Sequence, residues 1–145
     1  MKCVMSRLKK RILHHLAQEV YCRLGISTVH GIGVFAIRAI PEGIDPLCSL
    51  VENVDIKFSK SDLKDLPKSV REQIKMFCYY RKNDVYLPSM GLNAMNLAVY
   101  VNHSKAPNLK MKRNGTFETL RAIHKGEELF MDYDLAFGEK HIFDD

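Results

Sequence analysis

The chain has 145 residues, of which 46% are hydrophobic and 27% charged, a balance typical of one globular domain. Eight glycines and five prolines are too few for a collagenous or disordered chain, and no apolar run approaches the roughly 18–20 residues that cross a bilayer. The net charge is +5, but most of the excess lies before residue 24, where Glu19 is the only acid.

The first half of the chain predicts a helix followed by two strands. Apolar residues recur every fourth position and predict an amphipathic helix over Met5–Glu19. Tyr21–Thr28 and Val34–Ile40 are expected strands, with the segment His30–Gly33 as the turn between them. Leu47–Phe58 indicates irregular or edge-strand structure.

The second half predicts a helical segment and then short strands. Residues 59–80 show helical spacing of apolar side chains, and residues 97–101 form a short apolar stretch. Asn114-Gly115, between expected strands at 108–113 and 116–122, predicts a hairpin with a tight two-residue turn. Leu129–Tyr133 is one more expected strand. The pattern indicates an α+β domain that is mostly β.

The basic start and the cysteines limit the partners and the compartment. A basic first helix is more typical of solubility or docking than of nucleic-acid reading, because no interleaved aromatic and basic pattern accompanies it. The four cysteines never approach C-x-x-C spacing, so we predict no metal site; they are Cys3, Cys22, Cys48 and Cys78. The start lacks the apolar region of a secretory signal, which predicts a cytoplasmic or nuclear protein, not a secreted one.

The glycine pair Gly31 and Gly33 opens the segment G-I-G-V-F-A, which formally matches the dinucleotide-binding fingerprint. That fingerprint requires a helix to begin at the glycines. Here residues 37–40 run directly into Pro41 and Gly43, which leaves no room for one. The glycines therefore predict a tight hairpin, not a nicotinamide site.

Two further motifs follow: N-H-S-K-A-P-N at 102–108 and G-E-E-L-F-M-D-Y at 126–133. Each alone is typical of a polar turn or of a turn that feeds a strand. Together with G-x-G-V-F-A and in this order, they resemble the SET-domain family of protein-lysine methyltransferases over about Tyr21–Asp134. The layout is similar to that of compact, single-domain bacterial and viral members. The insert at about 57–95 lies where the family varies most.

The resemblance implies a fold of several small β-sheets, with the C-terminal segment threaded beneath a preceding loop as a pseudoknot. It divides the chain into a basic amphipathic helix at 1–20, a SET domain at 21–135 and a tail at 136–145. Within the SET domain, Pro107 and Asn108 would fix the loop under which the chain passes.

The resemblance also implies S-adenosyl-L-methionine as cofactor and methyl transfer to a lysine side-chain amine as the reaction. Asn102 and His103 would hold the amino-acid and adenine ends of the cofactor. Tyr133 matches the catalytic tyrosine, which would orient a lysine amine that has lost its proton. The complete set of residues expected to bind the cofactor is His30, Gly31, Ile32, Gly33, Asn102, His103, Tyr133 and Phe137.

Departures from the family pattern leave the lysine channel only partly assigned. Residues 44–50 hold no aromatic where many members have a tyrosine. Tyr86 and Tyr100 are candidates for the second channel aromatic, and each is equally compatible with simple packing. Met131 replaces the usual Phe or Tyr and favours multiple methylation, since a thioether provides no hydroxyl. Phe137 and Phe143 are candidates for a lid on the channel.

The expected partner is a protein with an accessible lysine, histone-like by family analogy; the basic helix makes a homodimer an option, and no nucleic-acid or membrane partner is expected. A basic enzyme would not attract a basic tail at long range. Local acids would have to do so, and the candidates are Asp132, Asp134, Glu139, Asp144 and Asp145. The alternative interpretation is a catalytically silent SET module that binds a protein partner.

Overall fold

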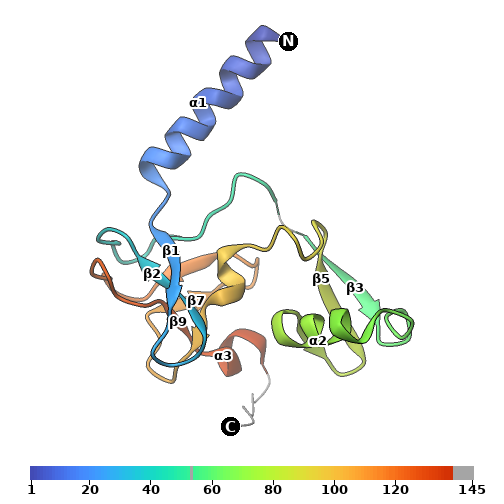
Figure 1. The fold of residues 1–145 in the computed structure, drawn as a ribbon. Coiled ribbons are helices and arrows are strands. Elements are labelled where there is room, and N and C mark those ends of the chain that lie inside the picture. Colours follow the sequence, from blue (N-terminus) through green and yellow to red (C-terminus); the bar gives the residue numbers. More distant parts are fainter. Residues whose placement is uncertain (53, 139–145) are drawn as a thin grey trace. The chain divides into compact units, whose positions relative to one another are not determined.

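The computed structural model describes residues 1–52 and 54–138 (Figure 1). The chain forms two compact units: Met1–Leu50 together with the segment from Tyr100 onward, and Val51–Val99. We call them unit 1 and unit 2 and describe each by itself. The three motifs all lie in unit 1.

Unit 1 begins with the helix α1 (Lys2–Gln18), the blue helix of Figure 1. Two polar contacts join the helix to the rest of unit 1: Arg11 Nη2 donates to Leu50 O at 3.2 Å, and, at the last turn, Arg38 Nη1 donates to Ala17 O at 3.1 Å. Several apolar side chains of the helix are exposed, namely Val4, Met5, Leu8, Ile12, Leu13 and Leu16. Within the described residues, no helix combines the length and apolar character needed to cross a membrane.

The strands β1 (Cys22–Ile26) and β2 (Ile32–Ala36) form an antiparallel pair. The predicted turn at 30–33 is wrong in its position, because β2 already begins at Ile32 and Gly33 pairs with Gly25 inside the ladder. The connection is made at 27–31, where Ser27 N donates to Gly31 O at 2.9 Å. Gly31 has φ +49, a left-handed conformation that suits glycine, whereas Gly33 lies in the strand for a different reason described below.

A four-stranded sheet has the order β6-β9-β7-β8. Its members are β6 (Asn102–His103), β7 (Leu109–Met111), β8 (Phe117–Thr119) and β9 (Phe130–Met131). The C-terminal strand β9 is parallel to both β6 and β7 and lies between them. Met131 pairs with His103 on one side and with Leu109 on the other, so the connection 104–108 must cross one face of β9. This is the crossing that the resemblance predicted.

The buried side chain of Asn108 holds the crossing loop to the segment that includes β9. It is 2% exposed, its Nδ2 donates to Glu128 O at 2.8 Å, and its Oδ1 accepts from Phe130 N at 2.8 Å. Both bonds go to backbone groups of the segment that passes beneath the loop. An asparagine is needed because its amide supplies one donor and one acceptor to a strand edge.

The β7–β8 hairpin differs from the prediction at its turn. Lys112 N donates to Thr116 O, and Gly115 N donates to Lys112 O at 3.0 Å. The loop therefore comprises three residues, 113–115, with Gly115 at φ +80, rather than the two residues Asn114-Gly115. A glycine in the left-handed region is equally suited to this three-residue loop, so the Asn-Gly pair alone does not determine loop length.

The core of unit 1 lies where these strands meet the segments around Ile40 and Ile123. Backbone bridges pair Phe35 with Glu128 and Ile40 with Ile123. The fully buried side chains of unit 1 are Val34, Ile40, Val101, Leu109, Thr119, Ile123 and Leu129. The strands that carry the polar motifs are thus held together by a core of fully buried side chains.

The C-terminal part of unit 1 ends as a helix rather than as the predicted strand Leu129–Tyr133. The strand β9 stops at Met131, and the short helix α3 (Tyr133–Phe137) begins two residues later. Asp132 is the N-cap, and its side chain accepts from Asp134 N at 3.0 Å. This cap explains why the chain changes from an extended to a helical conformation at Tyr133.

Unit 2 contains the sheet β3-β5-β4 and the helix α2 (Lys68–Phe77), which occupies only the middle of the segment 59–80 predicted to be helical. The two ends of that segment belong to strands instead. Its strands are β3 (Asp55–Ser59), β4 (Tyr79–Arg81) and β5 (Asp84–Pro88). β3 is an edge strand, in agreement with the prediction for that segment. The 3-10 helix η1 (Leu97–Tyr100) takes the place of the short apolar stretch and leads back to unit 1.

Candidate active site

Asn102 is the centre of a polar cluster formed by all three motifs. It is 9% exposed, and its Nδ2 lies 3.0 Å from His30 O, 3.3 Å from Ile32 O and 2.9 Å from Glu128 Oε1. An amide nitrogen has only two hydrogens, so three acceptors surround two donors. The cluster is therefore richer in acceptors than its own donors can satisfy.

Gly33 allows this cluster to form. A Cβ at this position would lie 2.1 Å from Glu128 Oε1 and 3.3 Å from Asn102 Nδ2. Its glycine is thus required by the close approach of a carboxylate to the strand, not by backbone conformation. A Cβ at Gly31 would have no neighbour within 4 Å. Gly31 is therefore favoured by its left-handed backbone conformation, and Gly33 by the space that Glu128 occupies.

Glu128 is a site residue that the sequence analysis quoted within a motif but did not assign. Its second oxygen, Oε2, accepts from Ser27 Oγ at 2.9 Å, so the carboxylate connects the β1–β2 connection to Asn102. The preceding Glu127 does something different: it pairs with Arg121, which together with His124 N holds the pKa of Glu127 below its usual value. A backbone bridge pairs Glu128 with Phe35 on β2, and this long-range pairing is not visible in the sequence.

His103 is linked to Tyr133 by a backbone contact. Tyr133 N donates to His103 Nδ1 at 3.0 Å, and the two rings have centroids 5.3 Å apart. This bond requires a lone pair on Nδ1. His103 Nδ1 also lies 3.9 Å from Asp132 Oδ1, beyond hydrogen-bonding distance.

Tyr133 directs its hydroxyl back into the fold. Its O–H donates to Val101 O, the carbonyl immediately before Asn102. Burial raises the pKa of the Tyr133 phenol above its ordinary value, so the group stays protonated at neutral pH. This bond fixes the position of the phenol oxygen within unit 1.

Phe137, on α3, packs edge-on against Tyr133, with ring centroids 5.7 Å apart and planes at 70°. The base of this helix is held by Lys105, whose Nζ lies 3.2 Å from both oxygens of Asp132 and also pairs with Asp134. Burial tends to raise the pKa of Asp132, but Lys105 and Asp134 N outweigh it and leave that pKa below its usual value. Lys105, which sequence reasoning missed, thus fastens the crossing loop to α3.

The remaining predicted residues are placed as follows. Met131 is 4% exposed in the central strand β9, and Tyr100 ends η1 two residues before Asn102. Tyr86 lies in β5 of unit 2, where its ring is 5.6 Å from that of Tyr79. Phe143 lies outside the described residues. The structure therefore brings together the three motifs and Phe137, while Tyr86 belongs to the other unit.

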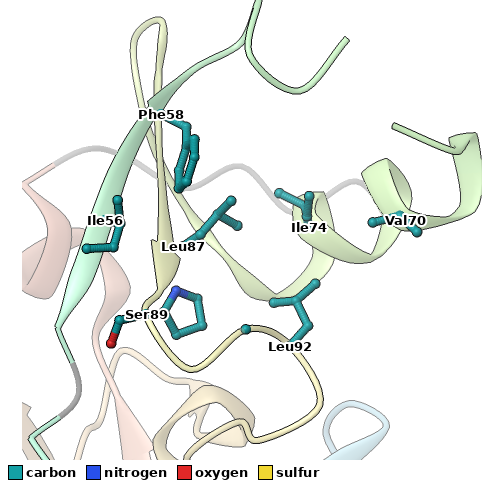
Figure 2. A pocket seen from close by; sticks show the side chains of 9 residues that line it. Ile56, Phe58, Val70, Ile74, Leu87, Ser89 and Leu92 are labelled. Carbon is teal, nitrogen blue, oxygen red and sulfur yellow. The ribbon is translucent and has the colours of Figure 1, made fainter. Parts of the chain in front are cut away.

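Unit 2 carries an apolar pocket of about 320 Å³ between β3, β5 and α2. Figure 2 shows side chains of these elements around it. Its lining consists of Ile56, Phe58, Val70, Ile74, Leu87, Pro88, Ser89, Gly91 and Leu92. This lining contains no titratable side chain and no predicted site residue, and its one polar side chain is the Ser89 hydroxyl.

Comparison with known proteins agrees with this arrangement. The family model of the SET domain matches residues 31–134. A crystal structure of a Plasmodium falciparum protein named "putative histone methyltransferase" is similar in fold, with a TM-score of 0.50 and 19% sequence identity. The similarity covers 79% of this chain and 93% of that one. No curated protein matches the chain. With all three motifs assembled in one unit and most of the chain matched, the protein belongs to the SET-domain family of protein-lysine methyltransferases.

Proposed function

We propose that the protein is an S-adenosyl-L-methionine-dependent protein-lysine N-methyltransferase. The observation that supports this most is the meeting of two features in one unit. An acceptor-rich cluster surrounds Asn102, and the half-buried Tyr133 donates a hydrogen bond to Val101 O, the carbonyl of the residue before Asn102.

The cluster fits the charge of the cofactor. The amino end of S-adenosyl-L-methionine is an ammonium, which brings three hydrogens and a positive charge. His30 O, Ile32 O and the Glu128 carboxylate provide acceptors and negative charge in the same place, and Gly33 lets the carboxylate approach the strand. Gly31, Asn102 and His103 would complete the binding set. The cofactor supplies an electrophilic methyl group on a sulfonium.

Tyr133 is proposed as the catalytic residue that positions the substrate amine. Because burial raises its pKa, the phenol does not act as the base at neutral pH. We propose that its oxygen, held in place by the bond to Val101 O, accepts an N–H from the neutral lysine amine. That bond orients the amine lone pair, and the amine proton passes to solvent beforehand. The ordinary lysine pKa of about 10.4 falls in an apolar environment, which favours the neutral form.

Aromatic side chains are proposed to line the lysine channel. Phe137 presents its edge to Tyr133 and extends the apolar wall on the α3 side. Tyr100 and Met131, both in unit 1, remain the candidates for the other walls. Met131 keeps multiple methylation as the proposed outcome, since it adds no hydroxyl that would restrain a water.

The proposed substrate is a protein with an accessible lysine, and a histone-like protein is the first to test. The neighbouring protein from Plasmodium falciparum carries the histone assignment in its name, and it shares the fold with this chain. Lys105 neutralises Asp132 and Asp134 in part, so these acids offer less attraction to a basic tail than the sequence suggests. Glu139, Asp144 and Asp145 lie outside the described residues.

Calorimetric titration with S-adenosyl-L-methionine tests this proposal. We expect saturable binding to the wild type and a loss of at least about tenfold in affinity for Asn102→Ala. The matched control is Asn114→Ala, an asparagine of the β7–β8 loop, which should bind as the wild type does. Binding without transfer to any lysine protein would favour the silent SET module, and absence of binding by the wild type would overturn the proposal.

A further inference from the structure

A second cluster lies where α1 joins the rest of unit 1. His15 Nδ1 and Glu19 Oε2 are 2.8 Å apart, one helical turn from each other, and Cys48 contributes a thiol from the segment 41–50. The three ligand atoms all lie within 4.8 Å of one another, and all three residues are partly buried. The sequence predicted no metal site, because its cysteines never approach C-x-x-C spacing.

We propose that His15, Glu19 and Cys48 form a binding site for a single divalent transition-metal ion, with zinc as the ion that fits best. Imidazole, carboxylate and thiolate are the three ligand types that zinc takes in proteins, whereas calcium and magnesium prefer oxygen alone. A tetrahedral zinc ion holds its ligand atoms about 3.3–3.6 Å from one another. The distance of 2.8 Å between His15 Nδ1 and Glu19 Oε2 is about 0.5 Å shorter than this, and no separation among the three ligand atoms exceeds 4.8 Å. Small side-chain adjustments therefore bring the three atoms to tetrahedral spacing.

The charges and protons of the site balance on metal binding. The thiol of Cys48 loses its proton to solvent and binds as thiolate. The Glu19 carboxylate binds through one oxygen, and His15 binds through Nδ1 with its remaining ring proton on Nε2. One thiolate and one carboxylate cancel the charge of a divalent ion, so the partly buried site becomes neutral. A water molecule takes the fourth position, since the side chains of His15 and Glu19 are 20% and 35% exposed.

The surroundings of Cys48 favour a cation. Two carboxylates, those of Glu19 and Asp45, lie close enough to the Cys48 thiol to interact with it electrostatically. A bound cation would offset the negative charge of both. Asp45 itself accepts from Leu47 N at 2.9 Å and Phe117 N at 3.1 Å, which keeps it in the segment as a backbone cap and not as a fourth ligand.

The site would tie the last turn of α1 to the 41–50 segment. Arg11 already links the same two elements through Leu50 O. A metal ion would add a second, stronger connection about one turn further along the helix. It would thereby hold α1 in a fixed position against the segment 41–50. The proposal concerns α1 and does not depend on cofactor binding or methyl transfer.

Cobalt(II) absorption spectroscopy on the full, untagged and reduced chain tests the site, because thiolate coordination gives an intense near-ultraviolet charge-transfer band. We expect this band to saturate at one ion per chain and to disappear when zinc is added. His15→Ala and Cys48→Ser should each lose more than about 100-fold in cobalt affinity, a larger loss than second-shell changes cause. The matched controls, His14→Ala and Cys78→Ser, should retain the band.

Three results would overturn the proposal: no charge-transfer band in the wild type, a band that survives in Cys48→Ser, or equal losses in the control variants. Far-ultraviolet circular dichroism checks the fold of each variant. His15→Ala keeps the test decisive if Cys48→Ser fails to fold, since it leaves the segment 41–50 intact.

Discussion

Replacing Gly33 by alanine tests the geometry of the cofactor cluster. The new Cβ would lie 2.1 Å from Glu128 Oε1, where ordinary contact begins near 3.4 Å, so the carboxylate must move by more than about 1 Å. That movement breaks the 2.9 Å bonds from Asn102 Nδ2 and Ser27 Oγ. Since the displaced atom is the end of a flexible side chain, the backbone of β2 stays in place.

The expected cost follows from these two bonds. A hydrogen bond to a charged group contributes about 1.5–3 kcal/mol, and a partly exposed carboxylate recovers some of that in water. A glycine-to-alanine change without strain stabilises by about 0.4–1 kcal/mol through the unfolded chain. We therefore expect Gly33→Ala to lower the free energy of unfolding by about 1–3 kcal/mol. Its affinity for S-adenosyl-L-methionine should fall by at least about tenfold.

Urea denaturation and calorimetric titration of a double-mutant cycle with Glu128→Ala provide the assay. Once Glu128 is removed, the alanine at position 33 meets no carboxylate, so the double variant should be no less stable than Glu128→Ala alone. Strictly additive losses, within about 0.5 kcal/mol, would refute the reasoning. Gly115→Ala is the control: its φ of +80 costs stability, but no atom lies within 4 Å and cofactor affinity should not change.

Two further predictions concern the crossing. Asn108→Ala should lower the free energy of unfolding by about 2–5 kcal/mol in urea denaturation, because it leaves Phe130 N and a backbone carbonyl buried without partners; a loss below about 1 kcal/mol would contradict this role. Asp132→Asn should weaken the acid dependence of stability. The lowered pKa of Asp132 stabilises the fold above its usual value of about 3.9, and this contribution fades as the pH falls through the lowered value. The difference in urea midpoint between about pH 6 and pH 3 should therefore shrink in the variant, and an unchanged difference would refute the pairing with Lys105.

The fold was predictable where local signals and ordered motifs agreed. The spacing of apolar residues located the helices at α1 and α2, and the three motifs together indicated the family and the crossing. The turn at 113–115 and the start of β2 were misplaced, because an Asn-Gly pair suits more than one loop length and a glycine in a strand looks like a turn residue.

The candidate site was predictable only in part. Asn102, His103 and Tyr133 stand in their motifs, but the roles of Ser27, Glu128 and Lys105 depend on contacts between residues 26 to 101 positions apart. Such contacts leave no local periodicity in the sequence. The same applies to the cluster of His15, Glu19 and Cys48, whose members the fold assembles from a helix and a distant loop.

The most direct measurement of the central claim is methyl transfer from radiolabelled S-adenosyl-L-methionine to a panel of lysine-containing proteins and peptides, histones included. The wild type and Tyr133→Phe would be compared at saturating cofactor. We predict transfer to lysine by the wild type and a loss of at least about 100-fold in rate for Tyr133→Phe, with cofactor affinity nearly unchanged. Equal transfer by the two proteins would contradict the role assigned to Tyr133, and cofactor binding without transfer to any lysine would contradict the enzymatic function.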